Sequence, residues 1–129
     1  MDGSRSPSRY SRADEPTLYL SSSREGITAA MIAHTDASTP ELEVIELRVN
    51  ADRIVDLRDP DALARLGVSL ENATAPWQGV GAPPSWRVRD RLVARGANGL
   101  IDPGRKAPGL WHLVLLRWNA DGTPSVARI

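Results

Sequence analysis

The order of apolar and polar residues along the chain predicts short strands separated by short helices. Residues 17–20, "TLYL", have the β-branched and aromatic content of a strand. Residues 42–49, "LEVIELRV", alternate apolar and polar positions, which is typical of a strand with one buried face. Residues 110–118, "LWHLVLLRW", are apolar almost throughout, so this strand is predicted to lie in the centre of the sheet.

Three shorter strands complete the predicted sheet. "RIVDL" at 53–57 and the apolar stretch 99–101 are short segments of the kind that form buried strands. "NADG" at 119–122 has the turn chemistry of a β-hairpin. The segment that follows, "SVARI" at 125–129, is therefore expected to return as an edge strand.

Three helices are predicted from capping residues and helical spacing. The first follows Ser22, which forms a capping-box pattern with Glu25. Its apolar face holds Ile27, Ala30, Met31 and His34. The second has Asp59 as N-cap, Pro60 at the first helical position and Gly67 as the stop.

The third helix is predicted between Ser85, as N-cap, and Gly96, as stop. It carries four arginines, at positions 87, 89, 91 and 95. We expect them to form a solvated helix face, and the alternative is a surface for an acidic partner or a phosphate. Residues 71–84 are rich in turn formers and are expected to form a loop that carries Trp77.

Mixed strands and helices in a chain of 129 residues favour one domain, residues 1–129, of the α+β or mixed α/β class. Residues 1–12 lack apolar periodicity, and we expect them to be loosely ordered without a ligand or partner. No apolar run reaches the length that crosses a bilayer, and the polar start does not resemble a secretory signal. The sequence thus indicates a cytoplasmic protein that is not bound to membranes.

Charge and composition exclude further classes. The chain has 16 basic and 16 acidic residues, so no excess of positive charge favours binding to nucleic acid. It has no cysteine, and His34 and His112 are too far apart in the sequence to suggest a zinc cluster. No metal site is predicted, and His112 is expected to be a hydrogen-bonded structural residue.

The usual short motifs of hydrolases, nucleotide triphosphatases, metalloproteases and dinucleotide-binding folds are absent from the sequence. A longer pattern remains: Arg9-Tyr10, "LYLSSS" at 18–23, Trp77, "GANGLIDPGR" at 96–105, and the apolar strand at 110–118. In order and approximate spacing this pattern resembles the RES-domain family, the toxins of bacterial RES–Xre toxin–antitoxin pairs.

The resemblance implies an ADP-ribosyltransferase-like domain with a curved mixed sheet and a cleft for NAD. Family members consume NAD as a substrate, by hydrolysis or phosphorolysis of the nicotinamide–ribose bond or by ADP-ribosyl transfer, and no further cofactor is implied. The implied partner is an Xre-like antitoxin protein. A homo-oligomer is left open.

The resemblance also implies roles for individual residues. Arg9 would hold the diphosphate of NAD, for which an arginine fork is suited, and Tyr19 would stack on nicotinamide. Tyr10, Trp77 and Arg105 are the remaining predicted NAD-binding residues. The family usually carries a longer segment before the arginine than the eight residues that precede Arg9 here.

Two positions depart from the family pattern. The family glutamate, which would stabilise the positive charge of the ribose as nicotinamide leaves, corresponds to Ala30, and the family serine corresponds to Gly104. Glu25 and Asp36 are the candidate catalytic replacements. The alternative to a toxin is a catalytically silent RES-like module that binds a nucleotide or another protein.

Overall fold

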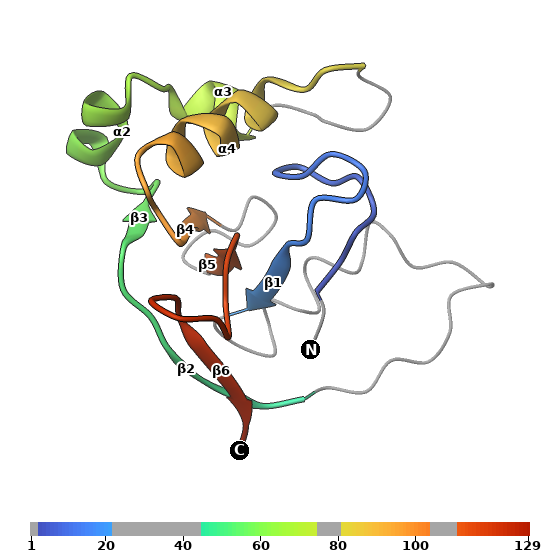
Figure 1. The fold of residues 1–129 in the computed structure, drawn as a ribbon. Helices are drawn as coiled ribbons and strands as arrows, with labels where there is room; N and C mark the ends of the chain where they lie inside the picture. The colour runs from blue at the N-terminus through green and yellow to red at the C-terminus, as the bar shows by residue number, and fades with distance from the viewer. Residues whose placement is uncertain (1–2, 22–44, 75–80, 104–110) are drawn as a thin grey trace.

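The computed structural model describes residues 3–21, 45–74, 81–103 and 111–129. Within these ranges three strands are followed by three short helices and then by three more strands (Figure 1). Their bounds are β1 (Leu18–Ser21), β2 (Leu47–Asn50), β3 (Ile54–Asp56), α2 (Pro60–Leu66), α3 (Leu70–Thr74), α4 (Pro84–Ala94), β4 (Gly99–Pro103), β5 (Trp111–Leu115) and β6 (Ser125–Arg128). The predicted mixed α/β class is confirmed.

A four-stranded mixed sheet has the strand order β1-β5-β4-β3. β5 pairs antiparallel with β1 and β4, whereas β3 and β4 are parallel. The apolar segment 110–118 therefore contains an interior strand, as predicted. Glycine is required at the start of β4, because a Cβ on Gly99 would lie 2.3 Å from the carbonyl oxygen of Val114.

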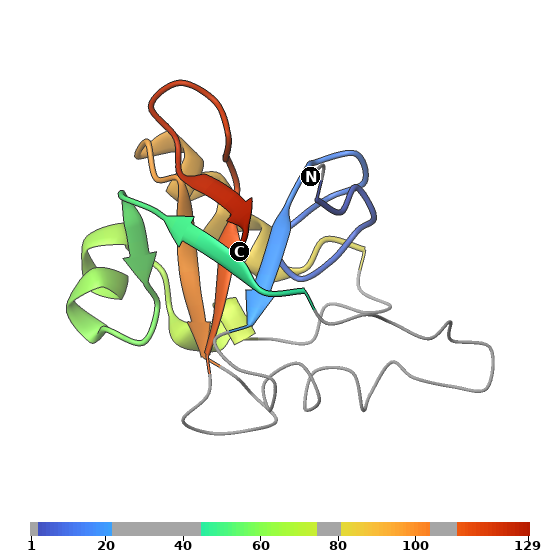
Figure 2. The ribbon, with the colours of Figure 1, turned by 90° about the horizontal axis from the view of Figure 1, so that it is seen from below.

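β2 and β6 form a separate two-stranded antiparallel sheet, so the prediction that 125–129 returns beside 110–118 is wrong. The side chain of Asn119 bonds to both backbone groups of Val126, accepting from its N–H at 2.8 Å and donating to its carbonyl oxygen at 3.1 Å. These contacts shape the turn before β6, which then pairs with β2. Figures 1 and 2 show the β2–β6 pair on one side of the larger sheet and the helices on the other.

The helix ends predicted from local sequence are confirmed in part. α2 confirms its predicted caps: the Asp59 carboxylate accepts a bond from the N–H of Asp61 at 3.0 Å, and Gly67 is left-handed with φ 68°. The predicted loop at 71–84 is wrong at its start, because α3 continues to Thr74, with the Ser69 hydroxyl accepting from the N–H of Asn72 at its beginning. Ser85 is also not the N-cap of α4, a place taken by Pro83.

Two predicted strands are shifted. β1 begins one residue later than predicted, since Thr17 is buried and bridges instead to Ser4. β2 begins at Leu47, and Ile45 is 43% exposed rather than facing a core. The helix predicted after Ser22 lies outside the described residues.

The hydrophobic core lies between the four-stranded sheet and the helices. Leu100 of β4 and Val114 of β5 are adjacent in the register, and both are almost fully buried. The same core cluster contains Val88 and Leu92 of α4. Tyr10, from the N-terminal segment, also belongs to it. The face of the sheet that carries Leu100 and Val114 is therefore the face that α4 covers.

Candidate functional site

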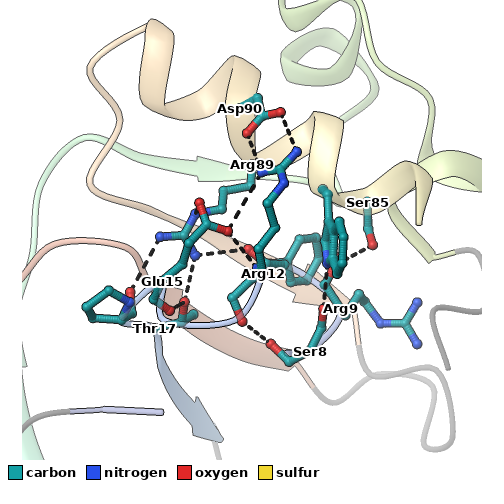
Figure 3. Close-up of polar contacts among 12 residues, drawn as sticks. Ser8, Arg9, Arg12, Glu15, Thr17, Ser85, Arg89 and Asp90 are labelled. Atoms are coloured by element: carbon teal, nitrogen blue, oxygen red, sulfur yellow. Dashed lines mark hydrogen bonds and ion pairs between the residues drawn. The ribbon is translucent and has the colours of Figure 1, made fainter. Parts of the chain in front are cut away.

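The N-terminal segment is fastened to α4 by a buried arginine. The Arg89 side chain, in a residue only 7% exposed, donates to the carbonyl oxygen of Tyr10 at 3.0 Å and to the Thr17 hydroxyl at 2.6 Å. It also donates to Pro16 O at 3.4 Å and lies 3.6 Å from the Glu15 carboxylate (Figure 3). The predicted solvated face is thus wrong for Arg89, because the N-terminal segment supplies the oxygens that replace water.

The loop that carries Arg9 is held on both sides of that residue. The Trp86 indole N–H donates to the carbonyl oxygen of Ser8 at 2.8 Å. The Ser85 hydroxyl donates to the carbonyl oxygen of Arg9 itself. The side chain of Arg9 is half-buried and points away from this polar cluster (Figure 3). The fold therefore fixes the backbone of Arg9, and the guanidinium points away from the residues that hold this backbone (Figure 3).

Tyr10 points the opposite way, into the core. It is 1% exposed, and its hydroxyl donates to the Asp102 carboxylate and to Ala73 O, the latter at 3.3 Å. Burial, and secondly the negative charge of Asp102, raise the pKa of Tyr10 well above its ordinary value. In this structure Tyr10 anchors the loop beneath Arg9. Its contact with NAD stays a prediction.

Tyr19 of β1 lies beside the same loop. Its hydroxyl is hydrogen-bonded to the Ser8 hydroxyl and accepts from the N–H of Tyr10 at 3.3 Å. The residue is 38% exposed. Three of the predicted NAD-binding residues, Arg9, Tyr10 and Tyr19, are thus brought together by a few hydrogen bonds.

The other predicted site residues lie outside the described residues. They are Glu25, Ala30, Asp36, Trp77, Gly104 and Arg105. Their predicted roles stay predictions.

A row of polar side chains crosses three neighbouring strands next to Tyr19. Ser21 of β1 is paired with His112 of β5, which is paired in turn with Asp102 of β4. Directly paired residues share a face, and the Ser21 hydroxyl lies 2.9 Å from Nδ1 of His112. Tyr19 is on the same face, since it lies two residues before Ser21. The prediction of a hydrogen-bonded His112 is confirmed.

The sequence alone does not predict this row. Ser21 and His112 are 91 residues apart, and Asp102 reaches them only through the pairing of β4 with β5. A correct strand register is the one signal that could have placed the three together.

A second feature lies between α3 and the start of α4. A depression of about 370 Å³ is lined by residues that include Arg12, Asn72, Trp86 and Arg87. The Arg12 guanidinium lies 5.3 Å from the centre of the Trp86 ring and binds both oxygens of Asp90, at 2.8 and 2.9 Å. Its charge is thus already engaged within the protein.

Within the described ranges no group of three or more histidine, cysteine, aspartate or glutamate residues could hold a metal ion. In the same ranges no helix is long and apolar enough to cross a membrane.

Comparison with known proteins identifies the family. The RES domain family model matches residues 1–128, nearly the whole chain. The chain therefore belongs to the RES domain family, as the resemblance implied. No curated protein and no solved structure shows significant similarity to it.

Proposed function

We propose that this RES domain protein binds NAD at the edge formed by Arg9 and Tyr19 and cleaves its nicotinamide–ribose bond. It would act in the cytoplasm as the toxin of a toxin–antitoxin pair, with an Xre-like protein as its antitoxin. The observation that carries the proposal is the anchored Arg9 loop, in a chain that belongs to the RES family.

An arginine is suited to a diphosphate because its planar guanidinium donates paired, charge-assisted hydrogen bonds. Such a group binds more tightly when its backbone is fixed in advance, since less conformational entropy is lost on binding. The bonds from Ser85 and Trp86 provide this fixation on either side of Arg9. The Tyr19 ring, held through its hydroxyl, is the neighbouring aromatic surface for nicotinamide.

The reaction requires that the bond between the ribose carbon and the nicotinamide nitrogen breaks with both electrons going to nicotinamide. A positively charged ribose remains, and a carboxylate nearby would lower the energy of that state. Glu25 and Asp36 are the candidates for this role in place of the family glutamate. Water, phosphate or a protein side chain would then take the ribosyl group.

The second candidate function is a nucleotide-binding or protein-interaction module without catalysis. It is favoured by the sequence positions of the family glutamate and serine, which hold Ala30 and Gly104 here. Alanine carries no charge to stabilise the ribosyl cation, and glycine carries no hydroxyl. Under this function Arg9 would still bind NAD, but nicotinamide would not be released.

The test measures nicotinamide release by chromatography and NAD binding by calorimetry on the same preparation. Arg9→Ala is expected to weaken NAD binding about 10- to 100-fold, the loss of hydrogen bonds to a charged group. Arg5→Ala is the matched control, because Arg5 is an exposed arginine in the same segment. Equal binding by Arg9→Ala and the wild type would remove Arg9 from the site.

The same assay separates the two functions. Release by the wild type that is lost in Arg9→Ala supports the enzyme, whereas binding without release supports the silent module. The double variant Ala30→Glu/Gly104→Ser restores the family residues and is expected to create or raise release. No release from this variant, with its fold intact by circular dichroism, would contradict the proposed reaction.

A further inference from the structure

The row of Ser21, His112 and Asp102 has no role in the NAD binding proposed above, yet it lies beside Tyr19 and contacts Tyr10. Ser21 is on the same strand and the same face as Tyr19, two residues further along. Ser21 and His112 are both half-buried, so neither is sealed within the core. The inference drawn from this row rests on the proposed function.

Ser21 and His112 have the geometry of a nucleophile and its base. A serine hydroxyl is a weak nucleophile until a neighbouring base takes its proton. The distance of 2.9 Å between the Ser21 oxygen and Nδ1 of His112 lies within the range for such a pair. A histidine that only supports a sheet needs a hydrogen-bond partner, but the partner need not be a hydroxyl at the edge of the candidate site.

Asp102 lies next to this pair in the sheet. It is directly opposite His112 in the register and 8% exposed. The buried Tyr10 hydroxyl donates to its carboxylate, which fixes Asp102 in place. A buried carboxylate next to a histidine is the feature that orients the imidazole in nucleophile–base pairs on other folds. Tyr10 therefore connects this row to the loop that carries Arg9.

We propose that Ser21 is the acceptor of an ADP-ribosyl group from NAD, so that the protein modifies itself at the end of β1. The bond between the ribose carbon and nicotinamide breaks, and nicotinamide leaves with the electron pair. The Ser21 oxygen forms the new bond to the ribose carbon, and its proton passes to Nδ1 of His112. No oxidant or reductant is needed.

The position of Ser21 favours it over a distant side chain. An acceptor on the strand that carries Tyr19 needs no second binding event, because the ribosyl cation would form beside it. The modification would also place a bulky charged group at the candidate NAD site. A modified molecule is then expected to bind no further NAD, and each molecule would react once.

The experiment incubates the purified chain with NAD radiolabelled in its adenylate phosphate. Nicotinamide release and protein-bound label are measured together, and the labelled residue is located by mass spectrometry with electron-transfer fragmentation. The expected result is label on Ser21 with about one nicotinamide released for each label bound. Ser21→Ala is expected to lose the label. Ser125→Ala, a serine on a strand of the second sheet, is expected to keep it.

His112→Asn tests the base. An asparagine amide can still bond to the Ser21 hydroxyl but cannot take its proton, so labelling of Ser21 is expected to slow about 100-fold or more. The melting temperature is measured alongside, because a purely structural role would alter stability and not the labelling rate. Labelling at the wild-type rate would remove His112 from the proposal.

The outcomes separate this inference from the proposed function. Release of nicotinamide without label on the protein, or label on another residue, overturns the inference and leaves the proposed NAD cleavage standing. Absence of both release and label overturns the two together. Equal labelling by free ADP-ribose, which reacts with amines without enzyme action, would also count against Ser21.

Discussion

Two neighbouring residues of α4 bind the N-terminal segment. One makes a buried contact, called here the inner contact, and the other makes a solvent-exposed contact, called the outer contact. Arg89 forms the inner one and is 7% exposed, with bonds to oxygens of Tyr10, Pro16 and Thr17. Asp90 forms the outer one with Arg12, and these side chains are 53% and 40% exposed. Consecutive helix positions point about 100° apart, so one faces the protein and the other faces water.

The difference shows that burial, not the number of hydrogen bonds, decides how much each contact contributes to the stability of the folded protein. The outer pair has bidentate geometry, yet water and salt compete with it at the surface. The inner arginine has lost its water, and the protein oxygens around it are its replacement. Removing it leaves those oxygens without a donor in a place that water reaches poorly.

The largest expected effect is therefore that of Arg89→Leu. We expect it to lower the free energy of unfolding by about 3–5 kcal/mol, the range for breaking a buried charged network. Urea unfolding followed by circular dichroism measures the change. The control is Arg87→Leu, an exposed arginine of the same helix, with an expected change of about 0.5 kcal/mol or less. A loss of less than about 1 kcal/mol in Arg89→Leu would contradict the assignment.

Tyr10→Phe is expected to have an intermediate effect. It removes the hydroxyl that donates to the buried Asp102 carboxylate and to Ala73 O. The expected loss is about 1–3 kcal/mol, the cost of an unsatisfied buried group. Tyr19→Phe is the matched control. Tyr19 is 38% exposed, so water can replace the hydrogen bonds of its hydroxyl.

The same variant has a predicted signature at high pH. Burial and Asp102 raise the pKa of Tyr10 in the folded state, so above about pH 10 the unfolded chain loses this proton while the folded protein keeps it. The stability present below that pH then falls as pH rises towards the folded pKa. Tyr10→Phe is expected to remove this decline, whereas Tyr19→Phe keeps it. Identical slopes in wild type and Tyr10→Phe, measured from pH 8 to 11, would contradict the assignment.

The features that could be predicted from the sequence depend on neighbouring residues or on long apolar runs. Asp59, Pro60 and Gly67 define α2 because caps and stops act within one helical turn. The apolar run around β5 predicted an interior strand because both of its faces must be covered. These signals do not require knowledge of the rest of the fold.

The features that were missed depend on contacts between distant segments. The sequence around Ser85 is typical of an N-cap, but its hydroxyl donates to Arg9 O, 76 residues away. In the sequence Arg89 has the pattern of a surface residue, but in the structure the N-terminal segment covers it. β6 follows a turn typical of a hairpin, yet it pairs with β2, because strand pairing depends on partners that local turn signals do not specify.

The candidate site divides in the same way. Arg9, Tyr10 and Tyr19 were found as parts of a family pattern, and the structure brings them together. Nothing in the spacing of Ser21 and His112 indicates a pair, since their contact exists only in the β1–β5 register. Residue type and order are the basis for predicting the first group, whereas the second group is defined by the strand topology.

The smallest effect is expected for the outer contact, where a double-mutant cycle of Arg12→Ala and Asp90→Ala isolates the pair from the Arg12–Trp86 contact. The coupling energy is expected to be about 0.2–1 kcal/mol and to shrink in 1 M salt. The hydrogen bond from Arg12 lowers the pKa of Asp90, so the contribution is present above about pH 4 and is lost as pH falls through the lower folded pKa. A coupling above about 2 kcal/mol, unaffected by salt, would show that the outer contact is shielded from water like the inner one.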